Sequence, residues 1–227
     1  MIDGFYQVRG FDTSTATFIR GDKGWVVIDP LTTTETARAA FELVTEHLGS
    51  RPVTAVIYTH SHVDHFGGIL GMVEQERIDA GEVPIVAPEG FLREAVAENL
   101  LAGPAMGRRA MYQFGMLLPW DEQGHVDQGL GKGLATGSSA LVPPTIEITE
   151  TGQELVLDGI RVEFQLTPET EAPAEMHFYF PEHRALCMAE NCTCLLYTSP
   201  SPRDQRGSGF PGCWLKKKRG GGGGGGG

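Results

Sequence analysis

Apolar and polar residues alternate in short blocks along the first sixty positions of the chain. Residues 5–10, 16–21 and 24–30 are apolar runs separated by Gly, Asp and Pro, and each predicts a short strand. Residues 53–59 form a continuous apolar run, as expected for a strand that is buried on both faces. This part of the chain therefore predicts a largely buried sheet.

A helix is predicted over residues 33–48, where apolar side chains recur at helical spacing. Thr32 and Glu35 fit the capping-box pattern at its start, and Gly49 provides a stop at its end. The elements predicted after it are helices over residues 66–76 and 90–101 and a short strand over residues 84–88.

Strand signals return in the last third of the chain, after a region without a clear period. Residues 103–143 are rich in Gly, Pro and Met and predict a long irregular insertion. The strands predicted after it cover residues 145–149, 153–159, 161–168, 176–181 and 184–190. Because strands, helices and strands follow one another in blocks, the order favours two packed sheets with outer helices over a doubly wound sheet.

Composition and charge narrow the classes of partner. The 227 residues suffice for one domain or at most two, and 41% of them are apolar. Residues 194–227 hold 6 of the 18 Lys and Arg but only 1 of the 29 Asp and Glu, so residues 1–193 carry a formal charge of −16. A body this acidic does not offer a broad basic face to nucleic acid. No window approaches the roughly 18 apolar residues of a membrane span, and the N-terminus shows no signal peptide.

The last segment, residues 194–227, differs in kind from the rest. It consists of CLLYTSPSPRD, QRGSGFPGCWL, KKKR and eight glycines. The first string resembles the translation of a transposase adapter used in sequencing libraries, and the lysines and glycines resemble translated poly-A and poly-G. We interpret this segment as an artefactual or disordered low-complexity tail, which leaves residues 1–193 as a partial domain.

The most informative string is THSHVDHFGG at residues 59–68, directly after a predicted buried strand. His60, His62, Asp64 and His65 lie within six positions, and imidazole and carboxylate are ligands that zinc accepts. Four ligands from one loop exceed what a single catalytic zinc takes while it keeps an open position, which indicates two metal ions. The alternatives are histidines that make ordinary hydrogen bonds and a single structural zinc.

This string resembles the H-x-H-x-D-H motif of the metallo-β-lactamase superfamily. Within that superfamily the chain resembles the alkyl sulfatase branch in YTHSHVDHFGG (58–68), LTPETEAPAEM (166–176), RALCMAENCT (184–193), GWVVIDPLTTTETARAA (24–40) and APEGFLREAVAENLLAGPAMGRRAMY (87–112). The resemblance implies an α/β fold of the metallo-β-lactamase type, an αββα sandwich. It is truncated here, and residues 1–193 form the front part of the catalytic domain.

The resemblance also implies a binuclear site with two Zn²⁺ ions. Carried over residue by residue, the ligands are His60, His62 and Glu171 for one ion, Asp64 and His65 for the second, and Glu190 as the bridge beside the nucleophilic water. Asp64 and Glu190 are accordingly the catalytic candidates. The family's last histidine ligand lies downstream of Glu190 and is absent here, as are its helical dimerisation domain and its sterol-carrier-like domain.

Four other residues near these segments bear on the predicted site. Asp29 ends a predicted strand and either braces the metal loop or caps a turn. Glu175 is expected to be a solvated loop carboxylate rather than a ligand, and Cys187 a buried small hydrophobe. Glu169 replaces the glycine that is usual in its segment, which raises the question of a positive φ there.

Residues of the insertion and its approach offer candidates for substrate contact. Arg108 and Arg109 could pair with a sulfate oxyanion, but a surface role is favoured. The apolar residues that line an alkyl pocket, or else make core or dimer contacts, are Leu100, Leu101, Met106, Met111 and Met116.

The resemblance implies a hydrolase that cleaves alkyl sulfate esters to an alcohol and inorganic sulfate through a metal-activated water. The alternatives are a superfamily hydrolase of thioesters, lactones or phosphodiesters, a non-catalytic zinc-binding module, and an inactive fragment. The expected partners are a small-molecule alkyl sulfate and, for the full-length protein, a second copy in a homodimer formed through a domain absent here. The family resemblance suggests a periplasmic or secreted protein, but the location is left open because no signal peptide is visible.

Overall fold

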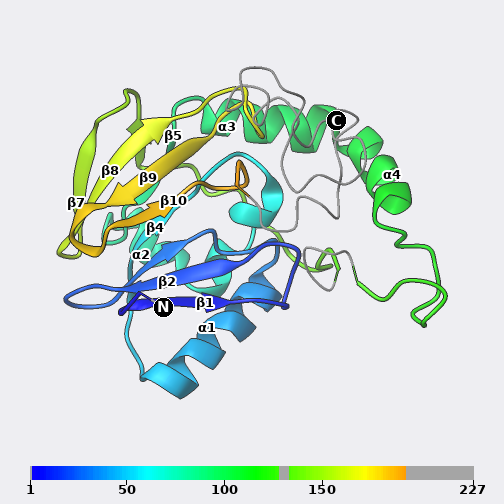
Figure 1. Ribbon diagram of the computed structural model, residues 1–227, viewed down its shortest axis with the longest axis horizontal. Coiled ribbons are helices and arrows are strands. Elements are labelled where there is room, and N and C mark those ends of the chain that lie inside the picture. Colours follow the sequence, from blue (N-terminus) through cyan, green and yellow to red (C-terminus); the bar gives the residue numbers. More distant parts are fainter. Residues whose placement is uncertain (1, 128–132, 193–227) are drawn as a thin grey trace, which may run out of the picture. The chain divides into compact units, whose positions relative to one another are not determined.

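The computed structural model describes residues 2–127 and 133–192, which Figure 1 draws as a coloured ribbon. Contacts divide the chain into two units after Ala189. The first unit contains all of the strands and helices described below. The segment predicted to be a low-complexity tail, residues 194–227, lies outside the described residues, and so does Thr193.

A six-stranded sheet has the strand order β1-β2-β3-β4-β5-β6. Its strands are β1 (Phe5–Val8), β2 (Ala16–Arg20), β3 (Trp25–Ile28), β4 (Val53–Ile57), β5 (Ile85–Pro88) and β6 (Ile146–Ile148). The first three pair antiparallel, whereas β3 to β6 pair parallel. The strands predicted for this part of the chain are confirmed, and β3 is buried along its whole length because both faces of the sheet are covered.

A second sheet is antiparallel throughout and appears in yellow to orange in Figure 1. Its strands, in the order β10-β9-β8-β7, are β7 (Glu154–Leu157), β8 (Ile160–Leu166), β9 (Met176–Phe180) and β10 (Ala185–Cys187). Strand β8 alternates strictly between buried and exposed residues from Ile160 to Gln165. Its buried side chains, such as Val162 and Phe164, pack with Val26 of β3 into one core between the two sheets. The predicted packing of two sheets is confirmed.

Helices cover the other face of the six-stranded sheet. Those packed on this face are α1 (Thr34–Leu48), α2 (Gln75–Asp79) and α3 (Phe91–Val96). The other helical segments are α4 (Gly103–Gln113), the 3-10 turns η1 (Val63–His65) and η2 (Ile69–Gly71), the π-helical turn η3 (Ala97–Leu101), and the 3-10 turn η4 (Pro181–His183) between β9 and β10. Val44 of α1, Ile78 of α2 and Phe91 of α3 pack with Val27 of β3 into a second core. Within the described residues, no helix is long and apolar enough to cross a membrane.

The start of α1 differs by one residue from the predicted capping box. The N-cap is Thr33, whose hydroxyl accepts a hydrogen bond from the Thr36 backbone N–H at 3.2 Å. Glu35 instead accepts a hydrogen bond from the Ser138 backbone N–H at 2.9 Å. Two adjacent threonines offer the same cap chemistry, and contact with a distant segment decides between them.

The predicted helix over residues 66–76 is wrong, because η2 and α2 are short turns separated by irregular backbone. Gly68 shows the physical reason. A Cβ at this position would lie 2.3 Å from the Pro30 carbonyl oxygen and 2.6 Å from that of Thr33. The metal-motif loop therefore approaches the start of α1 backbone to backbone, which a regular helix with side chains could not do.

The predicted irregular insertion, residues 103–143, contains helix α4. None of the side chains of α4 is buried, so the helix lacks the apolar stripe on which a periodicity argument depends. Downstream of α4 the described part of the insertion is irregular, as predicted.

Candidate metal centre

The motif loop leaves the carboxyl end of β4, where neighbouring parallel strands also end. His60 is fully buried and forms an isolated antiparallel bridge with Glu175, next to the start of β9. This bridge brings the loop from the first sheet beside the loop of the second sheet that carries Glu171.

Three of the predicted ligands come together at one point. His60 Nε2 lies 3.1 Å from His62 Nδ1 and 3.6 Å from Glu171 Oε2, and His62 Nδ1 lies 3.2 Å from the same carboxylate oxygen. Ligands held at 2.0–2.1 Å around a tetrahedral zinc are about 3.3 Å apart, by the geometry of a tetrahedron. The three atoms are therefore spaced as three ligands of one such ion, and this donor set fits zinc.

A second pair of predicted ligands lies on η1. His65 Nε2 is 3.3 Å from Asp64 Oδ2, and the rings of His65 and His60 are 4.0 Å apart between centroids. The group of Asp64 and His65 therefore lies beside the group of His60, His62 and Glu171. A nitrogen and a carboxylate oxygen at this separation again fit neighbouring ligands of one ion.

Asp29, at the end of β3, is connected by hydrogen bonds to both groups of predicted ligands. Its Oδ2 lies 2.8 Å from His65 Nδ1 and accepts a hydrogen bond from the Thr59 hydroxyl at 2.8 Å. That hydroxyl lies 2.8 Å from His60 Nδ1. Because a carboxylate only accepts, the hydroxyl donates to Asp29 and accepts from His60 Nδ1–H. In both rings Nδ1 therefore carries a proton that is held by Thr59 or Asp29, which leaves Nε2 as the nitrogen that faces the centre, so Asp29 braces the metal loop.

The electrostatics separate the two buried histidines. Burial, with the nearby charges of His65 and His62, holds the pKa of His60 well below its usual value. Burial also acts to lower the pKa of His65, but Asp64 and Asp29 outweigh it and raise that pKa well above its usual value. Burial acts to raise the pKa of Asp64, whereas the adjacent histidines reverse the effect and lower it. Asp64 is therefore ionised at neutral pH.

Glu171 lies on an exposed loop between β8 and β9, and its backbone is held by a neighbour. The residue two positions before it, Glu169, has a φ of +57°, in the left-handed region where glycine is usual. Glu175, expected to be solvated, is instead buried, with a carboxylate oxygen that accepts from the Glu171 backbone N–H at 2.9 Å. That expectation is wrong because the loop folds over the carboxylate and supplies its donors.

The remaining predicted residues at this end of the chain lie on or after β10. Cys187, expected to be a buried small hydrophobe, is half-buried and packs against the core between the two sheets, and burial raises the pKa of its thiol to about 12. Glu190 follows β10 in a turn and begins the second unit of the chain. Its role as a bridging ligand stays a prediction.

Comparison with known families and proteins shows to which family the chain is related. The family model of the Metallo-beta-lactamase superfamily matches residues 9–187. The chain belongs to this superfamily. The predicted metallo-β-lactamase-type fold is thereby confirmed.

Among members of the superfamily, this chain is similar to alkylsulfatases. It is 50% identical over 201 residues to a linear primary-alkylsulfatase from Pseudomonas sp. and 50% identical over 191 residues to an alkyl/aryl-sulfatase from Saccharomyces cerevisiae. These matches cover 88% and 84% of this chain. It also matches the solved structure of a stereoselective inverting sec-alkylsulfatase from Pseudomonas sp., with a TM-score of 0.80, 46% identity and 84% of this chain covered. The chain spans 30% of the length of each of these three proteins.

Two residues of this superfamily member join the centre without having been predicted. Glu98 of η3 places Oε1 3.6 Å from Nε2 of His62, whereas the other ring nitrogen, Nδ1, faces His60 and Glu171. Ser14 donates a hydrogen bond from its hydroxyl to the Asp64 carbonyl oxygen. Neither residue has metal-ligand spacing in the sequence, and each reaches the loop only through folding. No sequence pattern marked either residue. In the structure Glu98 lies on a π-helical turn, a distortion often found at functional sites.

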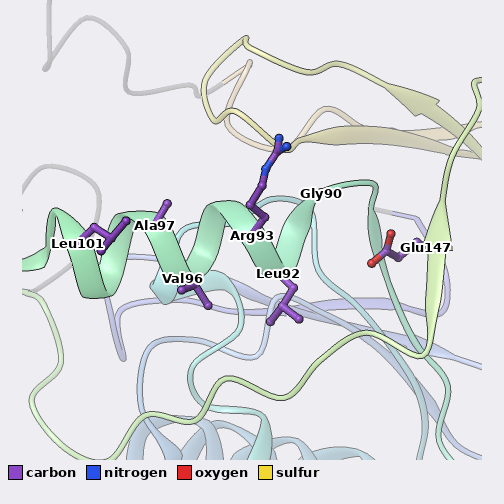
Figure 2. Close-up of a pocket in the computed structure, with 7 residues that line it drawn as sticks. All are labelled: Gly90, Leu92, Arg93, Val96, Ala97, Leu101 and Glu147. Carbon is purple, nitrogen blue, oxygen red and sulfur yellow. The ribbon is translucent and has the colours of Figure 1, made fainter.

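The candidates for substrate contact lie mostly on the surface. Arg108 and Arg109 are exposed on α4, which agrees with the surface role favoured for them. Of the apolar candidates, Leu101 lines a groove of about 550 Å³ along α3 and η3, which Figure 2 shows with Leu92 and Val96 on one side of the helix and Arg93 on the other. None of the predicted metal ligands is among the lining residues of this groove.

Proposed function

We propose that this chain is part of a zinc-dependent hydrolase that cleaves alkyl sulfate esters to an alcohol and inorganic sulfate. The observation that carries the proposal is the spacing between the side chains of the motif loop and Glu171. Nitrogen and carboxylate oxygen atoms of two adjoining groups are 3.1–3.6 Å apart, which fits zinc ligands. The names of the similar alkylsulfatases supply the substrate class.

The proposed centre holds two zinc ions. The proposed ligands are His60, His62 and Glu171 for the first ion and Asp64 and His65 for the second, with Glu190 as the bridge that the resemblance to alkyl sulfatases implies. Imidazole with carboxylate favours zinc over magnesium or calcium, which prefer oxygen ligands alone. A divalent ion supplies a Lewis acid that lowers the pKa of bound water toward 7 and offsets negative charge on the substrate.

The side chains of this protein prepare the reaction in three ways. Asp29 and Thr59 keep His60 and His65 in the tautomers that present Nε2 to the centre. The lowered pKa of His60 keeps that ring unprotonated at neutral pH, so no proton competes at Nε2. Asp64 is ionised and accepts a hydrogen bond from the attacking water, which orients the water for attack on the ester.

Because the chain is acidic, we expect an anionic substrate to bind only where positive charge is concentrated, as at such a centre. The body carries a formal charge of −16, which repels a sulfate ester at long range. Local positive charge is therefore needed where the sulfate binds, and a centre of two divalent ions provides it.

A substrate panel tests the proposal. The full-length product of the gene that encodes this chain is loaded with zinc and offered a linear alkyl sulfate, a thioester, a lactone and a phosphodiester. We expect inorganic sulfate from the first, with at least a 100-fold loss in Asp64→Asn and none in Asp79→Asn, an exposed aspartate on α2 that accepts a hydrogen bond from the Gln75 side chain. Turnover of a thioester, lactone or phosphodiester without sulfate release contradicts the choice of substrate.

We also propose that the full-length protein is a homodimer, as the resemblance to alkyl sulfatases implies. Sedimentation equilibrium of the full-length gene product gives its mass directly. A monomer at micromolar concentration contradicts this part of the proposal.

A further inference from the structure

Glu175 is a buried carboxylate that the proposed chemistry does not use. Its residue is 1% exposed, and Oε2 accepts three hydrogen bonds from one short loop. The donors are the Thr170 hydroxyl at 2.9 Å, the Glu171 backbone N–H at 2.9 Å and the Ala172 backbone N–H at 3.0 Å. One carboxylate oxygen therefore accepts hydrogen bonds from three consecutive residues of the turn that carries Glu171.

The main chain of Glu175 is tied to the opposite side of the centre. Glu175 forms the isolated bridge with His60, and the next residue, Met176, donates its backbone N–H to the Thr59 carbonyl oxygen at 3.0 Å. The Glu175 carbonyl oxygen also accepts from the Thr167 backbone N–H at 2.9 Å, which closes the base of the loop. Glu175 is therefore fixed to the histidine loop through its backbone and to the Glu171 loop through its side chain.

Two other hydrogen bonds close the turn that carries Glu171: the Glu169 backbone N–H donates to the Pro173 carbonyl oxygen at 3.2 Å, and the Thr170 hydroxyl is shared with the Thr167 carbonyl oxygen at 2.6 Å. Both stay within the loop, whereas the bonds to Glu175 tie the turn to the residue that pairs with His60.

Residues 168–171 are exposed, so they contribute no apolar core. Glu169 has a φ of +57°, a backbone conformation that costs about 1 kcal/mol for a residue with a side chain. A turn that is exposed and strained needs specific hydrogen bonds to stay ordered, and charge-assisted bonds to a carboxylate are the strong kind.

We infer that Glu175 is a positioning residue. It holds the Glu171 carboxylate at the distance from the His60 and His62 nitrogens that separates two ligands of one metal ion. The inference rests on the proposed metal centre. It assigns Glu175 no contact with metal or substrate. Its effect is to place one ligand, contributed by the second sheet, against two ligands contributed by the first.

The test compares Glu175→Ala with Glu175→Gln in the full-length protein. Alanine removes the acceptor for all three donors, whereas glutamine keeps one carbonyl oxygen that can take the place of Oε2. Glu163→Ala is the matched control, because Glu163 is an exposed glutamate on β8 of the same sheet. Far-UV circular dichroism and thermal unfolding show that each variant is folded.

Two readouts follow the position of Glu171 without catalysis. Cobalt(II) replaces zinc, and its visible absorption gives the dissociation constant and the coordination number. Hydrogen exchange of the Glu171 and Ala172 amides in the metal-free protein reports whether the turn is held. We expect Glu175→Ala to bind cobalt about 10- to 100-fold more weakly and to lose protection at both amides. We expect Glu175→Gln to recover most of the affinity and protection and Glu163→Ala to match the wild type.

Wild-type cobalt affinity, absorption and amide protection in a folded Glu175→Ala protein overturn the inference. Losses in Glu175→Gln and Glu163→Ala that equal the loss in Glu175→Ala also overturn it, because the effect would then not depend on the hydrogen-bond acceptor at position 175. If the wild-type protein binds no cobalt, the proposed metal centre falls and the inference falls with it. The two failures are thereby distinguished.

Discussion

Asp29 Oδ2 lies 2.8 Å from His65 Nδ1, and the same oxygen accepts the hydroxyl of Thr59, which in turn bonds His60. One buried carboxylate at the end of β3 therefore sets the tautomers of two histidines, one in each proposed group of ligands. The strand ends of the parallel part of the sheet make this possible, because β3 and β4 are neighbours and finish at the same edge.

Asp29→Asn and Thr59→Val separate the two branches of this network. Asparagine presents an amide donor toward His65 Nδ1 and the Thr59 hydroxyl, which disfavours the metal-binding tautomers of both histidines. We expect cobalt affinity to fall about 10- to 100-fold at both ions in Asp29→Asn but only at the first ion in Thr59→Val. Two-site titration by visible absorption measures this. Equal losses at both ions in Thr59→Val would contradict the assignment.

The stability of the metal-free protein is expected to peak near pH 6.5. The folded pKa of His65 lies above the usual 6.5, so its contribution to stability is lost as the pH rises from 6.5 through that higher value. The folded pKa of His60 lies below 6.5, so stability falls as the pH drops from 6.5 and the unfolded chain alone takes up the proton. His177, whose pKa burial lowers, adds to the acid side.

Urea unfolding at a series of pH values measures these two limbs. Each proton contributes a slope of up to about 1.4 kcal/mol per pH unit. His65→Asn should flatten the alkaline limb and His60→Asn the acid limb. An alkaline limb that is unchanged in His65→Asn would show that His65 is not protonated in the folded state.

Glu98→Gln tests the residue that sequence reasoning missed. Its carboxylate faces His62 Nε2 at 3.6 Å and favours a proton there, which leaves Nδ1 for the metal. We expect a loss of about tenfold in cobalt affinity at the first ion and a shift of the His62 tautomer, visible in nitrogen-15 chemical shifts. Glu94→Gln is the matched control, since Glu94 lies one turn earlier and pairs with the exposed Arg93. An unchanged tautomer in Glu98→Gln rules the role out.

Glu169→Gly is expected to stabilise the folded chain by up to about 1 kcal/mol, because glycine adopts a φ of +57° without the cost that a Cβ brings. Cobalt affinity should stay within twofold of wild type, since the Glu175 hydrogen bonds do not involve the Glu169 side chain. Glu163→Gly, in the middle of β8, should instead destabilise by about 0.5–1 kcal/mol. Chemical denaturation measures both, and a destabilised Glu169→Gly protein contradicts the strain.

Local patterns were enough to predict the strands, because alternation and apolar runs reflect burial that the fold then provides. Residues 53–59 illustrate this, since β4 is covered on both sides. The failures lie where contact between distant segments decides the structure. Gly68 packs on the backbone of Pro30 and Thr33, and this contact replaces the predicted helix with short turns.

The predicted ligands also differ in whether the local sequence pattern could identify them. His60, His62, Asp64 and His65 could be recognised from their own spacing, because a loop after a strand directs alternate side chains to one place. Glu171 came from the resemblance alone, since it lies more than one hundred positions away in the sequence. Glu98 was missed because only the fold brings it within 4 Å of His62. The role of Glu175 was missed because the sequence pattern did not show that its carboxylate is buried beneath the neighbouring turn.

Sulfate release during zinc titration tests the central claim most directly. The full-length gene product is freed of metal with a chelator, zinc is added stepwise, and sulfate released from a linear primary alkyl sulfate is measured at each step. We predict no release without metal and a rise that reaches its plateau at two zinc ions per chain. Release that persists in the chelator, or a folded and zinc-saturated protein that releases no sulfate, would contradict the account.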